Sequence, residues 1–163
     1  MNKLQENLID KAYRMALQTD EKIHTGNPAE HTLIAEIEKE LDTRFPLSYI
    51  HFLIKYGNLS FFGETFYGTT QKGMQATSAP SVLFVTKNNR ALGQLSERMI
   101  AIKSSGYGPI FAIDMSEADQ YGEGKIVEVA LGYKITGEKK VLANSFAEFF
   151  YSEIENAIED LNE

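Results

Sequence analysis

The 163-residue chain contains no cysteine, no tryptophan and only three histidines. The absence of cysteine excludes disulfides, thiolate metal ligands and cysteine nucleophiles, and it fits a reducing compartment. No segment approaches the roughly 20 apolar residues that a membrane-spanning helix requires. The opening stretch MNKLQENLIDKAYRMALQTDEK carries charges throughout and lacks the apolar centre of a secretory signal. We therefore expect a soluble, cytoplasmic protein that has no contact with a membrane.

Positive charge is also scarce, since 16 Lys and Arg residues stand against 23 Asp and Glu residues, for a formal net charge of −7. A nucleic-acid-binding protein needs Lys and Arg to displace counterions from phosphates. The charge balance therefore argues against direct nucleic-acid binding and is compatible with a basic protein partner.

Signatures of catalysis are missing as well. The sequence has no G-x-S-x-G nucleophile elbow, no G-x-G-x-x-G loop and no Walker loop. His24 and His31 lack the companion ligands of a metal site, and His51 lies in an apolar segment where a hydrogen-bonded core or boundary histidine is expected. The stretch DMSEADQYGEG does not match an EF-hand, because Ala118 and Asp119 replace a ligand and the glycine. We expect no enzyme: no catalytic residue, no cofactor and no metal.

Helical periodicity predicts two helices in the first quarter of the chain. Residues 2–18 form the first. Its buried face is expected to carry Leu4, Leu8, Ala12, Met15 and Ala16. The stretch TGNPAEHTLIAEIEKEL predicts the second helix, capped by Asn27 with Pro28 in its first turn or, alternatively, by Thr32. Its apolar stripe consists of Leu33, Ile34, Ile37 and Leu41.

The segment RFPLSYIHFLIKYGN, residues 44–58, is apolar on almost every side of the helix that it would form. Pro46 suits the first turn of a helix, and Gly57 suits the left-handed residue that ends one. Because ordinary surface helices keep one polar face, we expect this helix to be buried throughout, between the preceding helices and the sheet. A polar substitution at Leu53 is then expected to unfold the protein.

After this helix the apolar residues occur in short runs that are typical of strands. LSFFGETFYG, residues 59–68, predicts a strand or hairpin, and PSVLFVTKNNRAL, residues 80–92, predicts a helix. Turn-like segments separate the next runs, which favours antiparallel pairing. The expected strands are residues 97–104, 108–115 and 125–131, followed by an edge strand within 132–144.

The last segment predicts the clearest helix, because Ser145 and Glu148 form an S-x-x-E capping box. Its apolar stripe comprises Phe146, Phe149, Phe150, Ile154, Ala157, Ile158 and Leu161. Helices at both ends and strands between them indicate an α+β fold. We expect a mainly antiparallel sheet packed by helices, with an extra N-terminal helix and a C-terminal amphipathic helix.

The C-terminal helix is acidic to its end and has no Lys or Arg from Ser145 onward. Acids there face the negative end of the helix dipole, which costs about 0.3–1 kcal/mol each when exposed. These residues form either a solubilising tail or an acidic surface that accelerates binding of a basic partner. In the second case we expect the acidic loop near Tyr121 to extend that surface, with Tyr121 as an aromatic anchor. The candidate partner-binding residues are Asp114, Glu117, Asp119, Tyr121, Glu123, Glu153, Glu155 and Glu159.

The segment IAEIEKELDTRFPLSYIHFLIKYGN, residues 34–58, resembles the signature of the SUKH superfamily, which includes a yeast cell-wall synthesis regulator and many bacterial immunity proteins. The matching positions are Ile34, Glu38, Leu41, Phe45, Pro46, Ser48, Tyr49, Phe52, Leu53, Tyr56, Gly57 and Asn58. IFAIDMSEADQYGEGKIVEV resembles the family's strand pair, while SFAEFFY and LSFFG are most similar to the YobK-like immunity proteins. The resemblance covers residues 30–155. Ile50 and His51 replace a polar pair of many relatives, and we expect them to pack against the first helix.

The resemblance implies one SUKH-like domain over residues 1–163, with 1–26 as a helical extension and 27–163 as the core. It also implies a non-enzymatic immunity protein, or antitoxin, that binds and neutralises a cognate bacterial toxin domain. A nuclease is the favoured toxin class, because its phosphate-binding surface is basic. The alternative is a regulatory or scaffolding module of the SUKH type that has no toxin partner. Contact residues vary with the toxin in this family, so the resemblance transfers none of them.

Overall fold

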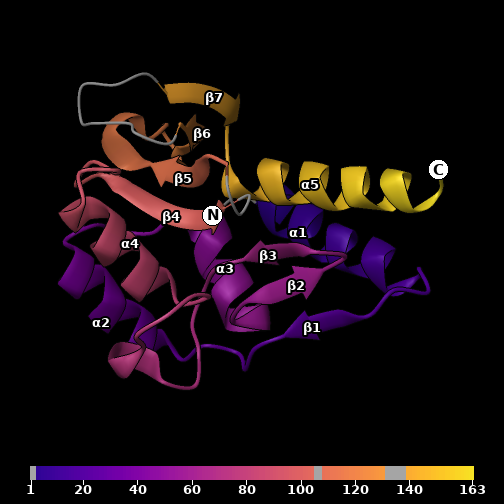
Figure 1. The fold of residues 1–163 in the computed structure, drawn as a ribbon, viewed down its shortest axis with the longest axis horizontal. Helices are drawn as coiled ribbons and strands as arrows, with labels where there is room; N and C mark the ends of the chain where they lie inside the picture. The colour runs from indigo at the N-terminus through magenta and orange to yellow at the C-terminus, as the bar shows by residue number, and fades with distance from the viewer. Residues whose placement is uncertain (1–2, 105–107, 131–138) are drawn as a thin grey trace.

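The computed structural model describes residues 3–104, 108–130 and 139–163, which form five α-helices and two antiparallel sheets (Figure 1). The helices are α1 (Lys3–Leu17), α2 (His31–Leu41), α3 (Leu47–Tyr56), α4 (Val82–Ala91) and α5 (Phe146–Leu161). The three-stranded sheet consists of β1 (Ile23–Thr25), β2 (Leu59–Phe61) and β3 (Glu64–Phe66). The four-stranded sheet consists of β4 (Met99–Ser104), β5 (Ile110–Asp114), β6 (Lys125–Val129) and β7 (Lys139–Ala143). The predicted α+β architecture is confirmed.

The four-stranded sheet is an antiparallel meander in chain order, so the three strands predicted from the apolar runs are confirmed. Strand β7 is the predicted edge strand, although residues 132–138 of that prediction lie outside the described residues. Short 3₁₀ turns, η1 (Gly73–Gln75) and η2 (Met115–Glu117), lie in the loops. The two sheets are joined where Tyr67 N donates to Ile102 O at 2.7 Å.

Strands β2 and β3 form a hairpin, one of the two alternatives predicted for residues 59–68, with Leu59 opposite Phe66. The two residues between the strands, Phe62 and Gly63, have φ values of +46° and +80°. Two consecutive positive φ angles match the type I′ turn that suits the right-handed twist of a hairpin. Glycine at the second position relieves the cost of that conformation.

Helix α3 packs against α5 through aromatic rings. The ring centroid of Phe52 lies 5.1 Å from that of Phe146 and 5.4 Å from that of Phe150. Phe150 in turn lies 4.8 Å from Phe66 of β3 in an edge-on arrangement. Tilted and edge-on ring pairs add to the stabilisation from buried apolar area. The three-stranded sheet, α3 and α5 therefore share one core.

The expectation that α3 is buried on every side is wrong. Its buried residues are Ser48, Tyr49, Phe52, Leu53 and Tyr56. Leu47, at its first position, is 41% exposed, and Lys55 is also exposed. The predicted ends are nearly right: Pro46 precedes the first turn as the N-cap, and Gly57 has φ +72° as the C-cap.

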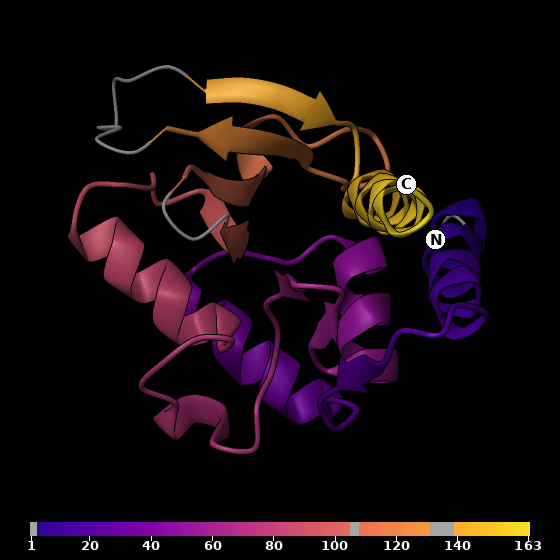
Figure 2. The same cartoon turned by 45° about the vertical axis from the view of Figure 1, so that its right-hand side comes forward.

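Helix α1 lies alongside α5 and also contacts α3, and Figure 2 shows α5 between α1 and the four-stranded sheet. The predicted apolar face of α1 is partly wrong, because Leu4 is 62% exposed. The buried residues are Ile9, Ala12 and Ala16. The side of α1 toward α3 also carries a polar residue, which hydropathy patterns do not count.

That polar residue is Asp10, which holds α1 to α3. Its Oδ1 accepts a hydrogen bond from Tyr56 Oη at 2.9 Å and lies 3.0 Å from His51 Nε2. The expectation of a hydrogen-bonded boundary histidine that packs against the first helix is confirmed. Burial would raise the pKa of Asp10, but the hydrogen bonds from His51 and Tyr56 lower it below its usual value.

The predicted caps of α2, Asn27 and Thr32, are both wrong, because the helix follows Glu30, whose side chain makes no capping bond. Tertiary hydrogen bonds hold the preceding chain in extended form instead, and Ala29 N donates to Leu53 O at 2.9 Å. The same extended path contains β1, for which the sequence pattern gave no prediction.

The capping box of α5 is confirmed, since Glu148 N donates to Ser145 Oγ at 3.1 Å. The Glu148 carboxylate reaches back to Asn144 N at 3.2 Å. Ser145 Oγ also donates to Gln5 Oε1 of α1 at 2.5 Å. The predicted stripe of α5 is confirmed too, because its residues are buried or half-buried throughout. The start of α5 is thus fixed both locally and by α1.

Candidate functional site

The predicted acidic loop joins β5 to β6, and its residues are of two kinds. Asp114 and Glu123 are each only 5% exposed, whereas Glu117, Asp119 and Tyr121 are exposed. Two of the candidate binding residues therefore lie inside the protein. This corrects the expectation that the acidic residues of the whole loop face a partner.

Asp114 ends β5 and fixes the start of the loop. Its Oδ1 accepts hydrogen bonds from Ser116 N at 3.0 Å and Ser116 Oγ at 2.7 Å, and its Oδ2 pairs with Lys139 of β7. Burial would raise the pKa of Asp114, but the bonds from Lys139 and Ser116 lower it below its usual value. This carboxylate is a structural link between β5 and β7.

Glu123 caps α3 from a position 75 residues away in the chain. Its Oε1 accepts a hydrogen bond from Ser48 Oγ at 2.6 Å, and its Oε2 accepts one from Ser48 N at 3.1 Å. That amide is one of the first-turn donors that have no partner within a helix, and Pro46 at the N-cap has no side-chain acceptor to offer it. Burial raises the pKa of Glu123, although the bonds from Ser48 partly offset this. Sequence patterns missed Ser48 because no local signal links the two residues.

The exposed tip of the loop is held in shape by its own hydrogen bonds. Asp119 Oδ1 accepts from Tyr121 N at 2.8 Å and from Glu123 N at 3.0 Å. Gly122 has φ +79°, a conformation that favours glycine. The tip presents Tyr121, which is 59% exposed, beside Glu117 and Asp119. We call these three residues the loop surface.

The acidic residues of α5 also divide into two kinds. Glu153 Oε1 accepts a hydrogen bond from Lys103 Nζ at 3.1 Å. Glu155 is half-buried and Glu159 is exposed, and neither forms an ion pair with a residue that the structure describes. We call Glu155 and Glu159 the helix surface.

Lys103 is a buried charge that sequence reasoning missed within the apolar run MIAIKS. It is 4% exposed, and its Nζ also lies 2.5 Å from Glu64 Oε2 and 4.9 Å from the ring centroid of Phe111. Burial would lower the pKa of Lys103, but Glu64 and Glu153 raise it above its usual value. Glu153 therefore neutralises a buried cation and links α5 to β4, so it is less available to a partner.

The loop surface and the helix surface are separate. Glu148, in the first turn of α5, is near enough to Glu123 to raise the pKa of that residue. The rise of 1.5 Å per residue places Glu159 about 16 Å farther along the helix axis than Glu148. Figure 1 accordingly shows the far end of α5 away from β5 and β6. A partner must be large enough to span both surfaces, or it uses one of them.

Comparison with known families assigns residues 31–150 of the chain to one of them. The SUKH_6 family model, described as SMI1-KNR4 cell-wall, matches residues 31–150. The chain belongs to the SUKH family. Members of this family are known as immunity proteins and cell-wall regulators, are generally not enzymes, and act through protein–protein interaction. The resemblance drawn from residues 34–58 is thereby confirmed.

Of the two surfaces of this SUKH protein, one lies inside the segment that the family model matches and the other lies outside it. The loop surface lies within residues 31–150, between two strands of the shared fold. The helix surface lies beyond residue 150, and α1 and β1 lie before residue 31. The two surfaces therefore combine a loop of the family fold with a helix end outside the matched segment.

The described part of the chain contains no group of three or more His, Asp or Glu side chains that could hold a metal ion. Its helices, as far as they are described, include none that is both long and apolar enough to span a bilayer. His24 and His31 are exposed.

Proposed function

We propose that this SUKH protein is an immunity protein that binds a cognate bacterial toxin domain and neutralises it. The observation that carries the proposal is the family match over residues 31–150, because the family is known for immunity proteins. We further propose that the toxin domain is basic and docks on the loop surface, the helix surface or both.

Electrostatics supports a basic partner. The chain has a formal net charge of −7. Glu117, Asp119, Glu155 and Glu159 have no ion-pair partner among the described residues, so their negative charge is not neutralised there, although Asp119 Oδ1 accepts two backbone hydrogen bonds within the loop. A nuclease is the toxin class that fits best, because it binds phosphates with Lys and Arg. Tyr121 supplies the aromatic anchor that protein interfaces favour.

Co-expression tests the proposal directly. Where the gene immediately upstream encodes a toxin domain, that domain is expressed in a bacterial host, alone and together with the full chain. We expect growth to stop with the toxin domain alone and to be restored by the chain. Death of the cells despite abundant, soluble chain would overturn the proposal, and purified chain that binds the domain without inhibiting it would favour the scaffolding alternative.

A further inference from the structure

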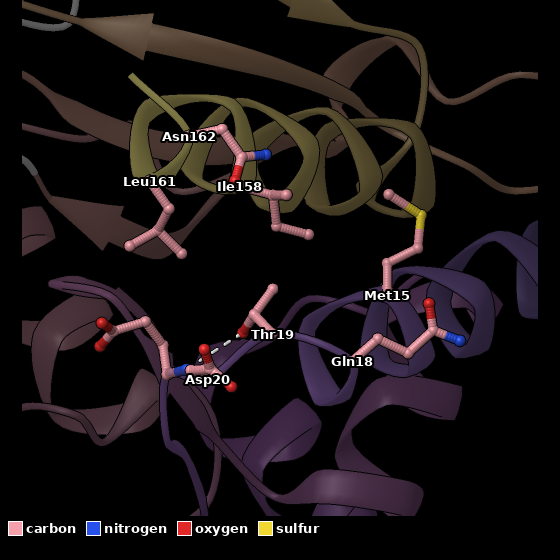
Figure 3. Close-up of a pocket in the computed structure, with 8 residues that line it drawn as sticks. Met15, Gln18, Thr19, Asp20, Ile158, Leu161 and Asn162 are labelled. Atoms are coloured by element: carbon pink, nitrogen blue, oxygen red, sulfur yellow. Dashed lines mark hydrogen bonds between the residues drawn. The ribbon is translucent and has the colours of Figure 1, made fainter.

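A cleft of about 570 Å³ opens where α1 and α5 end (Figure 3). Its lining residues are Met15, Gln18, Thr19, Asp20, Glu21, Ile158, Leu161 and Asn162. Figure 3 shows Ile158 and Leu161 extending from α5 toward the turn after α1, and Met15 extending from α1. A volume of this size falls within the range of about 300–1,000 Å³ that small ligands occupy, so it can hold one long side chain.

The lining combines an apolar wall with negative charge. Met15, Ile158 and Leu161 supply the apolar atoms, while Asp20 and Glu21 are exposed acids. None of the eight lining residues is basic, and neither acid forms an ion pair with any described residue. Because both helices end at the cleft, the negative ends of both helix dipoles face it.

We infer that this cleft receives a lysine or arginine side chain of a protein partner. Both side chains have an aliphatic stem that packs on apolar atoms and a cationic head that remains near water and acids. The apolar wall suits the stem, and Asp20 and Glu21 suit the head. The identity of the partner as a toxin domain rests on the proposed function, but the preference of the cleft for a cationic side chain does not.

The neighbouring cleft, of about 360 Å³, does not share this chemistry. Asp20 and Glu21 form a wall between the two clefts, but Lys22 and His24 also line the smaller one. A cation there meets positive as well as negative groups. The turn between the clefts is fixed by two hydrogen bonds, from Thr19 Oγ1 to Ala16 O at 2.7 Å and from Glu21 N to Thr19 Oγ1 at 3.3 Å.

The position of the cleft relative to the family match supports a role in partner choice. Every lining residue lies before residue 31 or after residue 150, outside the segment that the family model matches. Because an immunity protein must discriminate among partners, a pocket outside the segment that the family model matches is a suitable place for a specific contact.

The test uses the full chain and a small probe, so it requires no toxin. N-acetyl-arginine methylamide is titrated into isotope-labelled protein, and the amide shifts are followed by NMR. N-acetyl-norleucine methylamide, which has an apolar stem without a charge, serves as the reference probe. We expect saturable shifts at residues 15–21 and 158–162 with the arginine probe and much smaller ones with the norleucine probe.

The double variant Asp20→Asn/Glu21→Gln should bind the arginine probe about five-fold more weakly. The matched control Glu30→Gln/Glu36→Gln removes two exposed acids elsewhere and should bind it unchanged. Shifts of equal size with both probes, or shifts outside the cleft only, would overturn the inference. Failure of toxin neutralisation with a positive titration would instead refute the proposed function and leave the cation-binding cleft established.

Discussion

Glu123 and Asp114 have the same charge as the exposed acids beside them, but burial gives them a different role. Each carboxylate meets donors that are fixed by another element, α3 in one case and β7 in the other. A buried carboxylate of this kind is costly to leave unpaired. We therefore assign these two residues to the support of the loop and leave binding to Glu117, Asp119 and Tyr121.

Glu123→Gln tests that assignment through pH. The pKa of Glu123 is raised in the folded state. Its contribution to the stability of the fold therefore decreases as the pH rises from the unfolded-state pKa through the folded-state pKa. Glutamine keeps an acceptor and a donor for Ser48 but cannot ionise. Urea unfolding should therefore show the variant gaining stability relative to the natural protein as the pH rises above 4.5, the unfolded-state pKa of Glu123. Glu117→Gln, an exposed change in the same loop, should show no such trend. A Glu123→Gln difference that is independent of pH would contradict the assignment.

Asp10 gives the opposite pH dependence. The pKa of Asp10 is lowered in the folded state. Its contribution to stability is therefore present when the pH is above the unfolded-state pKa of 3.8, and it is lost as the pH falls through the folded-state pKa. Asp10→Asn should lower the free energy of unfolding by about 1 kcal/mol near neutral pH and hardly change it in strong acid. Urea unfolding at the two pH values measures this difference. An equal cost at both would show that the charge of Asp10 does not hold α1 to α3.

At the scale of elements, α3 links the helices to the sheets and is exposed only at Leu47 and Lys55. Leu53→Asn places a polar amide at a position with no exposed surface, and we expect it to cost about 3–5 kcal/mol. Leu47→Asn, on the exposed start of the same helix, should cost less than about 1 kcal/mol. Thermal and urea unfolding measure both, and similar losses for the two variants would contradict the observed orientation of α3.

We propose that the N-terminal extension, residues 1–26, unfolds together with the core, residues 27–163. The extension supplies α1, which packs on α5, and β1, which pairs with β2. Far-ultraviolet circular dichroism and tyrosine absorbance should therefore report one coincident urea transition. Two separated transitions would show that the extension is an independent unit.

Elements with local signals were predictable from the sequence. The Phe62–Gly63 turn, the Ser145–Glu148 capping box and the Gly57 helix end each depend on residues within a few positions of one another. Predictions failed where contacts between residues distant in the sequence determine the local structure. Asn27 lost its capping role because that part of the chain pairs with the α3 region, and β1 formed for the same reason.

For the candidate site, the sequence predicts which residue types are present but not which of them are buried or paired. The sequence identifies the acids, but it does not reveal that Glu123 binds Ser48 or that Glu153 neutralises the buried Lys103. The cleft between α1 and α5 also escaped prediction, because it exists only once the ends of the two helices are placed together. Burial and pairing of charges require the tertiary structure.

At the scale of the whole molecule, the negative charge should accelerate encounter with a basic toxin domain. Glu155→Lys/Glu159→Lys should slow association about 3- to 10-fold at low salt, and the difference should shrink at high salt as charges are screened. Stopped-flow mixing with the toxin domain measures the rates. Glu30→Lys/Glu36→Lys changes the net charge equally, at exposed sites outside both surfaces. Equal rates for the two variants would place the interface away from the helix surface.

The central claim, that this SUKH protein neutralises a toxin by binding it, is tested most directly with purified components. The proposed cognate toxin domain is assayed for its own activity while the full chain is added in increasing amounts. Direct neutralisation predicts that activity falls in proportion to the chain added and vanishes near one equivalent. Full toxin activity in the presence of a several-fold excess of folded chain would contradict it.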